Sequence, residues 1–298
     1  MSEYEEGDEA MPYIYLILSV LMNASSSVLG KAFNIKYGEQ KGSGTVYNFF
    51  QLTSAFSCWT ILFVFDLSFE FKVIGYSLLF SLCYAACNIG IINSLKYGPS
   101  TLTSLFVGLS LILTTIWGFM FWGDNISLSV ITGMILVSIS IYLCLRTGRQ
   151  KVKSFSWKWL FYVLFAFFGN AGCSIVQRTQ QVQYQGRYGN MMMFFATMFP
   201  ALSCMVVYLK KAKSNVIKKS KHICAIPILA GVCNVILNIL VMLMATTDLS
   251  PSFIYPSIGV GGLGVVVVFS LFVFKEKMSY RQWIGIATGV IAVLLLSV

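Results

Sequence analysis

Polar residues that could bind a ligand occur one helical turn apart inside long apolar segments of this chain. Asn23 and Ser27 are four residues apart, and Asn170 and Ser174 repeat this spacing in the second half. A step of four residues places two side chains on the same face of a helix. Because polar side chains are costly in hydrocarbon unless they meet one another, water or a ligand, these faces are predicted to line the interior of a helix bundle.

Two more pairs have the same spacing. One is Tyr84 and Asn88, and the other is Asn234 and Asn238. Together the four pairs predict a central cavity that binds a solute through amides and hydroxyls; the alternative is hydrogen bonding between helices, worth about 0.6 kcal/mol per bond on average. The other uncharged candidates for the cavity are amides and aromatic rings of the apolar segments: Asn48, Gln51, Asn190, Trp117 and Tyr255.

Two basic residues, Lys31 and Arg178, lie eight residues after Asn23 and Asn170, on the same helical faces. With the two asparagines near the membrane midplane, a rise of about 1.5 Å per residue places each cation roughly 12 Å away, toward opposite mouths of the cavity. We expect each cation either to attract an anionic or carboxylate-bearing substrate from the open side, or to extend its charged end to the lipid headgroups.

Catalytic groups and metal ligands do not accompany these residues. No acid lies inside the apolar segments, the eight cysteines include no C-x-x-C pair, and the single histidine, His222, is in a lysine-rich loop. A zinc site needs a cluster of Cys and His, and an intramembrane hydrolase needs a buried Ser/His pair or paired aspartates. We therefore expect no enzyme activity, no metal and no cofactor; an integral membrane enzyme or a non-transporting scaffold is the remote alternative.

Ten uncharged apolar segments carry the candidate residues. Of the whole chain, 57% is hydrophobic and only 11% is charged, whereas soluble domains carry about 25% charged residues. Each segment is long enough to cross about 30 Å of hydrocarbon. The sequence therefore predicts an all-α integral membrane protein with ten transmembrane helices. The predicted spans are residues 11–30, 45–65, 73–95, 100–122, 127–145, 159–177, 188–209, 223–247, 251–274 and 282–298.

The basic residues gather on one side of the predicted membrane. Of the 21 Lys and Arg residues, all but Lys72, Arg178 and Arg187 lie in the connections that follow the first, third, fifth, seventh and ninth spans. The positive-inside rule makes those connections cytoplasmic and places both termini outside the plasma membrane. The net charge of +10 thus indicates orientation and attraction to anionic lipid. We expect the lipid bilayer and a small solute as partners, and no nucleic acid.

The two halves of the chain repeat one another. Gly98-Pro99-Ser100 opens the fourth span and Ser250-Pro251-Ser252 opens the ninth, and an acid, Asp124 or Glu276, follows the proline after 25 residues in each case. The Asn, Ser and basic triplet recurs likewise in the first and sixth spans. Five spans per half make the second copy enter the membrane from the opposite side, so the sequence predicts two inverted five-helix repeats, an architecture typical of secondary transporters.

Four segments follow from this repeat. Residues 1–10 form an acidic tail, residues 11–146 the first repeat, residues 147–158 a basic cytoplasmic connection, and residues 159–298 the second repeat.

With these features the sequence resembles the drug/metabolite transporter superfamily, in its ten-helix EamA-type branch. The resemblance covers nearly all of residues 11–298 and rests on the two repeats, the Gly98-Pro99-Ser100 and Ser250-Pro251-Ser252 openings, and their acidic ends. It implies a transporter of small polar or amphipathic metabolites, such as amino acids, that works by alternating access; a multidrug or organic-cation exporter is the alternative. Short family members that export cations use a glutamate in their first helix, and the first span here has no acid, which disfavours a cation site of that kind.

Overall fold

The structure is a computed structural model, and it describes residues 2–37, 40, 42–97, 100–123, 127–145, 157–212, 224–247, 249–273 and 279–296. Within these ranges the chain forms ten α-helices, one short π-helix and no strand. The helices are α1 (Ser2–Tyr37), α2 (Ser43–Phe65), α3 (Phe71–Tyr97), α4 (Ser100–Trp117), the π-helix η1 (Gly118–Trp122), α5 (Leu128–Leu145), α6 (Trp157–Gln183), α7 (Gly189–Ala212), α8 (Ala225–Met244), α9 (Pro251–Phe272) and α10 (Tyr280–Leu296).

Several of these helices suit a membrane. Six of those that the structure describes are long and apolar enough to cross one, and four shorter apolar helices lie within the other predicted spans. The six are Met11–Tyr37, Ser43–Phe65, Phe71–Ile91, Trp157–Gln183, Gly189–Lys210 and Ala225–Met244. The shorter four are Ile112–Trp122, Leu128–Leu143, Pro251–Val266 and Trp283–Leu295.

The outer surface of the bundle agrees with this assignment. Large apolar side chains such as Phe65, Leu128 and Phe272 are 86%, 78% and 78% exposed. A soluble monomer rarely exposes extended apolar surface, because water disfavours it. The all-helical class of an integral membrane protein that the composition predicts is therefore confirmed in its general form.

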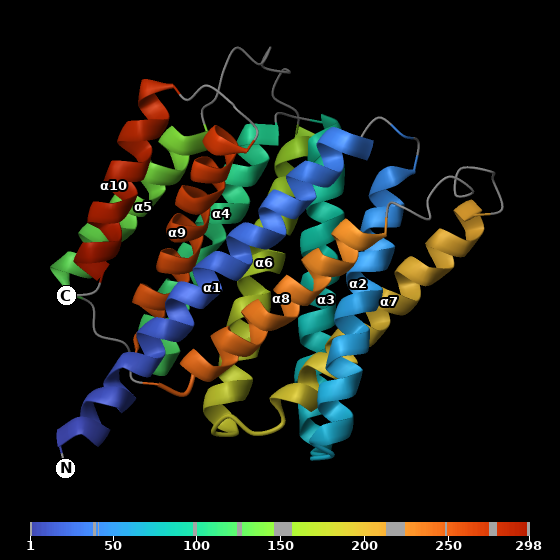
Figure 1. Cartoon of the computed structure of the whole chain (residues 1–298), viewed down its shortest axis with the longest axis horizontal. Coiled ribbons are helices and arrows are strands. Elements are labelled where there is room, and N and C mark those ends of the chain that lie inside the picture. Colours follow the sequence, from blue (N-terminus) through green and yellow to red (C-terminus); the bar gives the residue numbers. More distant parts are fainter. Residues whose placement is uncertain are drawn as a thin grey trace.

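The helices lie side by side in one bundle, with α5, α9 and α10 on one flank and α2, α3 and α7 on the other (Figure 1). Helix α3 packs on α6, α1 packs on α8, and α5 packs on α10. Helix α2 contacts both α7 and α8, and α7 also contacts α3. Helices α4 and α9 touch each other; in addition α4 packs on α6 and α9 packs on α1. These contacts enclose the middle of the bundle on all sides.

The α3–α6 contact brings two backbones together. A Cβ atom added to Gly90 of α3 would lie 2.5 Å from the backbone nitrogen of Ala166. One added to Gly169 of α6 would lie 2.5 Å from the backbone nitrogen of Cys87. Only glycine fits these positions, and small residues commonly permit such close approach of membrane helices.

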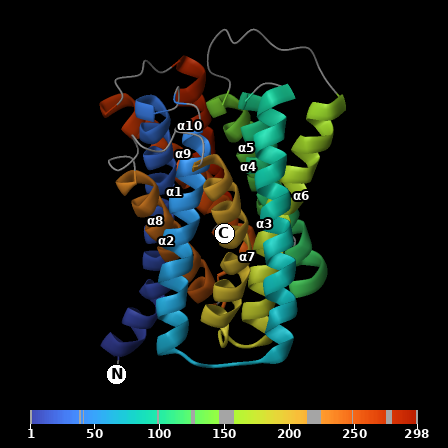
Figure 2. The ribbon, with the colours of Figure 1, turned by 90° about the vertical axis from the view of Figure 1, so that its right-hand side faces the viewer.

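One end of the bundle is tightly packed. We call it the lower end; it contains the α2–α3 and α6–α7 connections and lies at the bottom of Figures 1 and 2. Every residue from 251 to 258 at the start of α9 is buried there, as are residues 191–193 at the start of α7. The C-terminal ends of α1, α3, α5, α7 and α9 lie at the opposite end, which we call the upper end. The sequence predicts the connections that follow these five helices to be cytoplasmic.

Two helices extend by more than a turn beyond their predicted spans. Helix α1 begins at Ser2, so the acidic segment predicted as a tail continues the first helix. Helix α6 runs to Gln183, six residues beyond the predicted end of the span at Gln177. The prediction ended there because Arg178 follows; the helix continues because Arg178, Gln180 and Gln181 are buried against its neighbours.

Candidate functional site

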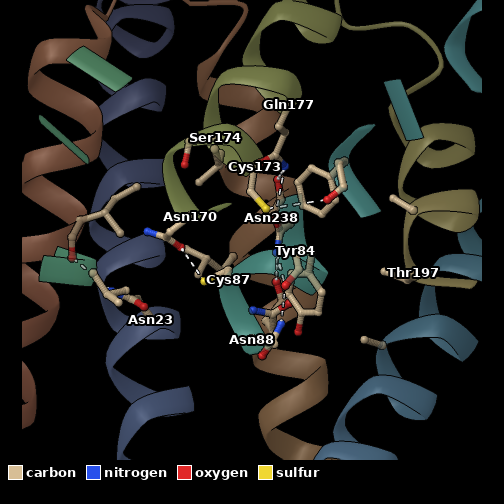
Figure 3. A pocket seen from close by; sticks show the side chains of 18 of the residues that line it. Asn23, Tyr84, Cys87, Asn88, Asn170, Cys173, Ser174, Gln177, Thr197 and Asn238 are labelled. Atoms are coloured by element: carbon tan, nitrogen blue, oxygen red, sulfur yellow. Dashed lines mark hydrogen bonds between the residues drawn. The ribbon is translucent and has the colours of Figure 1, made fainter. Parts of the chain in front are cut away.

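A cavity of about 590 Å³ lies in the middle of the bundle, with walls from both halves of the chain. This volume is in the range of small-molecule sites, about 300–1,000 Å³. Nine of the fifteen candidate residues line it, and Figure 3 shows several of them converging from different helices. The nine are Asn23, Ser27, Tyr84, Asn88, Asn170, Ser174, Asn234, Asn238 and Tyr255.

Helices α1 and α6 supply the first group of polar side chains. Asn23 Nδ2 donates a hydrogen bond to the carbonyl oxygen of Ile258 on α9 at 3.3 Å. Asn170 Nδ2 donates to the hydroxyl of Ser110 on α4 at 2.7 Å. The Tyr255 hydroxyl donates to the carbonyl oxygen of Ser174 at 3.4 Å. These bonds tie α1 to α9 and α6 to α4 and α9 around the cavity.

Helices α3 and α8 supply the second group in matching conformations. Asn88 Nδ2 donates to the carbonyl oxygen of Tyr84 at 2.8 Å. Asn238 Nδ2 donates to the carbonyl oxygen of Asn234, also at 2.8 Å. Each bond reaches back by one helical turn, so the two sequence pairs form the same local structure on two helices.

Sequence reasoning missed Gln177, which is 5% exposed and lines the cavity. Its Nε2 donates to Asn238 Oδ1 at 3.2 Å and so joins α6 to α8. A signal was present in the sequence, because Asn170, Ser174 and Gln177 follow the spacing i, i+4, i+7 of one helical face. The predicted span ends at Gln177, so this residue is expected at the membrane boundary and not in the cavity wall.

Sulfur, hydroxyl and aromatic groups complete the wall. The thiol of Cys87 contacts Asn170 Oδ1 at 3.9 Å, and that of Cys173 contacts the carbonyl oxygen of Phe80 at 3.9 Å. Thr197 on α7 lines the cavity as well. None of the residues that line the cavity in the described part of the chain carries a formal charge. The site is thus polar and uncharged.

Six candidates do not line the cavity: Lys31, Asn48, Gln51, Trp117, Arg178 and Asn190. Asn190 instead donates to Asp66 Oδ2 at 3.2 Å at the lower end. Trp117 stacks on Phe121, with ring centroids 4.2 Å apart. The carbonyl oxygen of Gln51 accepts a hydrogen bond from Ser54 at 2.9 Å, close to Gly231 of α8.

Arg178 is buried beside an aromatic ring. It is 7% exposed, and its Cζ lies 5.2 Å from the ring centroid of Trp122, at the end of η1. The side chain is therefore buried in the lower end of the bundle. Lys31, its counterpart on α1, is only half-buried.

Several sequence features lie outside the described residues. These are Gly98, Pro99, Asp124, Glu276, His222 and most of the basic residues of the predicted cytoplasmic connections.

Comparison with known proteins bears on the fold. No family model matches the sequence, and no curated protein matches it. Twenty-eight chains of solved structures match its fold. One of them, described only as "Crystal structure of protein", has a TM-score of 0.73 over 96% of this chain and 96% of its own, at 10% sequence identity. At this identity the match shows that the helix arrangement occurs in an experimental structure. Fold and site together define an all-helical protein in which helices long and apolar enough to cross a membrane surround a polar cavity.

Proposed function

We propose that this chain is a secondary transporter that moves a small polar or amphipathic organic metabolite, amino-acid-like in character, by alternating access. The observation that carries the proposal is the uncharged polar cavity of about 590 Å³, which side chains from both halves of the chain line. Polar groups inside a membrane protein are costly to keep and commonly mark a substrate pathway. The proposal includes no covalent chemistry, and no group of metal-binding side chains occurs among the described residues.

We also propose that the chain has ten spans in two inverted five-helix repeats, as in the EamA-type branch of the drug/metabolite transporters. The helix contacts support this symmetry. Under the repeat, each helix of one half corresponds to the helix five places along in the other half, so that α1 pairs with α6 and α3 with α8. Exchanging each helix for its counterpart turns the contact α1–α8 into α6–α3, α2–α8 into α7–α3, and α1–α9 into α6–α4. All of these pairs are in contact. The matching hydrogen bonds of Asn88 and Asn238 fall on the corresponding helices α3 and α8.

The orientation is part of the proposal. Lys31, Lys36, Lys158 and Lys210 belong to the upper ends of α1, α6 and α7, which supports a cytoplasmic upper end. Both termini would then lie outside the plasma membrane. The buried lower end supports a state in which the cavity is closed toward the outside. A cysteine-labelling reagent that does not cross membranes should reach a cysteine added at the C-terminus in intact cells; labelling only after lysis would reverse the orientation.

Flux in proteoliposomes tests the activity. The purified protein should exchange labelled small organic solutes, amino acids first, faster than protein-free liposomes do. Asn88→Leu should slow exchange by about tenfold or more, because it removes a polar group from the cavity. Asn93→Leu is the matched control: Asn93 makes the same backward hydrogen bond, to the carbonyl oxygen of Ile89 at 2.9 Å, but does not line the cavity. Equal exchange by wild-type protein and empty liposomes for every solute class would favour a scaffold.

A further inference from the structure

Backbone carbonyls fix the orientation of three amides in the cavity wall. The carbonyl one turn earlier accepts a hydrogen bond from Nδ2 of Asn88 and from Nδ2 of Asn238, at 2.8 Å in both cases. The carbonyl of Ile258 accepts one from Nδ2 of Asn23 at 3.3 Å. A backbone carbonyl can only accept, so the NH₂ group of each amide must face the wall. The amide oxygens consequently point away from these carbonyls.

Two further amides are oriented by their neighbours. Asn238 Oδ1 has only lone pairs to offer, so Gln177 must approach it with Nε2, at 3.2 Å. The Ser110 hydroxyl donates its proton to the carbonyl oxygen of Val107 at 2.6 Å, so it accepts from Asn170 Nδ2 at 2.7 Å. Gln177 and Asn170 thereby use their amide nitrogens for hydrogen bonds within the protein, and their amide oxygens remain as acceptors.

Several amide oxygens in the cavity wall are left as hydrogen-bond acceptors for a ligand. The side-chain oxygens of Asn23, Asn88 and Gln177 have no donor in the described part of the chain, and that of Asn170 has only the thiol of Cys87 at 3.9 Å. Acceptors without a donor are unfavourable away from water. A ligand that supplies donors would therefore bind with a gain that protein groups do not already provide.

Hydroxyl groups add further acceptors. Those of Ser27, Thr197 and Tyr255 donate to backbone carbonyls at 3.0, 2.8 and 3.4 Å, and their lone pairs have no donor among the described residues. The exception is Asn234, whose Oδ1 accepts from Asn238 at 3.2 Å and whose Nδ2 has no acceptor among the described residues. The amides of Asn23, Asn88 and Asn170 each have a second N–H group as well, so the cavity offers donors alongside the oriented amide oxygens.

We propose that the cavity recognises a protonated primary amine on its ligand, through N–H groups that donate to Asn23, Asn88 and Gln177. The inference deepens the proposed transport function and rests on it for its biological meaning. An ammonium group brings three donors and a positive charge, and hydrogen bonds from a charged donor are the stronger kind. The aromatic side chains of Phe80 and Tyr84 also line the cavity, and aromatic rings attract cations.

The same chemistry excludes other solutes. A carboxylate or phosphate without N–H groups would set its own lone pairs against the amide oxygens. A quaternary ammonium keeps the positive charge but has no N–H to donate. The recognition is also distinct from an acidic cation site, because no carboxylate lines the cavity in the described part of the chain.

Three matched probes test the proposal by binding to the purified protein, measured by calorimetric titration. They are 2-phenylethylamine, its N,N,N-trimethyl derivative and 3-phenylpropionate, which keep the ring and vary the head group. The primary amine should bind about tenfold or more tightly than either of the others, because only it donates to the amide oxygens. Equal or tighter binding of the carboxylate or of the trimethyl derivative would overturn the proposal.

Variants locate the binding to the acceptors. Asn88→Leu should weaken 2-phenylethylamine by about tenfold, whereas Asn93→Leu on the same helix should leave its affinity unchanged. If wild-type protein and Asn88→Leu bind 2-phenylethylamine with equal affinity, Asn88 does not bind the amine and this part of the proposal is wrong. Should Asn88→Leu fail to fold, the comparison of the three probes on wild-type protein decides alone.

The two proposals fail in different ways. Binding of the amine without flux of any solute in proteoliposomes would contradict transport and leave the recognition intact. Flux of a solute without an amine, together with no binding of 2-phenylethylamine, would contradict the recognition and leave transport intact.

Discussion

Two helix pairs border the cavity, and they are held together in different ways. Helices α3 and α6 meet through their backbones, since Gly90 and Gly169 each face the main chain of the other helix. Helices α1 and α8 correspond to them under the proposed repeat, but their glycines face elsewhere: Gly30 contacts Tyr47 of α2, and Gly231 contacts Ser54 and the carbonyl of Gln51, also on α2. A contact between backbones has no rotamers with which to adjust, whereas side chains can repack.

The difference indicates where movement is easiest. If the halves rock against each other, the α3–α6 contact should move as a unit, and the α1–α8 contact should take up the change by altering side-chain rotamers. Symmetry of topology therefore does not require symmetry of stiffness.

The largest expected effect comes from filling the α3–α6 contact. Gly90→Ala would place a Cβ 2.5 Å from a backbone atom of α6, and overpacking of this kind costs about 1–3 kcal/mol or more. The melting temperature of the purified protein should fall clearly. Gly75→Ala on the same helix is the control, because nothing lies within 4 Å of its added Cβ; alanine there should stabilise the helix by up to about 1 kcal/mol. Equal melting temperatures for the two variants would contradict a backbone contact.

The two corresponding asparagines should differ in the next-largest effect. Asn238→Leu removes the side-chain acceptor of Gln177 Nε2 at 3.2 Å and leaves it only the carbonyl oxygen of residue 238 at 3.5 Å; a poorly satisfied buried donor costs up to about 1–3 kcal/mol. Asn88→Leu removes a side-chain hydrogen bond with Tyr84 of the same helix and breaks none that joins two helices in the described part of the chain. Thermal unfolding should therefore show a larger loss of stability for Asn238→Leu. The reverse order would mean that Gln177 finds another acceptor.

A third variant tests whether the α3–α6 contact tolerates an added Cβ atom at a position where a glycine faces a side chain and not the backbone. A Cβ at Gly172 would lie 2.6 Å from the sulfur of Cys83, which a rotamer change can relieve in part. Gly172→Ala should lower the melting temperature less than Gly90→Ala does, and adding Cys83→Ala should restore most of the loss, a coupling of about 0.5–3 kcal/mol. Strictly additive effects of the two substitutions would show that the side chains do not meet.

The smallest effect on stability is expected beside α1. A Cβ at Gly262 of α9 would lie 2.6 Å from Asn23 Nδ2, the end of a side chain, whereas a Cβ at Gly264 meets nothing within 4 Å. In both alanine variants the free energy of unfolding should stay within about 0.5 kcal/mol of the wild-type value. Only Gly262→Ala should weaken ligand binding, because it displaces Asn23 from the cavity wall. Calorimetric titration with 2-phenylethylamine measures this difference. Identical affinities of the Gly262→Ala and Gly264→Ala variants would show that Asn23 does not contribute to ligand binding.

Much of the architecture follows from simple sequence patterns. Low charge and long apolar segments predict an all-helical membrane protein because few other structures satisfy backbone hydrogen bonds in lipid. Polar pairs one turn apart locate most of the cavity wall, since the spacing fixes the helical face and polar faces avoid lipid.

Other parts depend on neighbours that the pattern does not identify. Asn190 is as polar as Asn88, but it lies near the end of its helix and meets Asp66. Arg178 marks the end of a span by its charge, yet Trp122 covers it and the helix continues. The role of Gln177 follows from Asn238, 61 residues along the chain. Periodicity gives the direction of a side chain, and the partner that it meets is set by tertiary packing.

The absence of formal charge from the described cavity wall has an electrical consequence. In a transporter with such a wall, reorientation of the empty cavity carries no charge of its own across the membrane, so the membrane potential acts on the loaded step through the charge of the cargo and any coupled ion. That potential is worth about 2.3 kcal/mol per elementary charge per 100 mV. A monovalent amine would therefore generate a current with each turnover and a zwitterion carried alone would not, so the sign and size of the current would report the charge of what is carried.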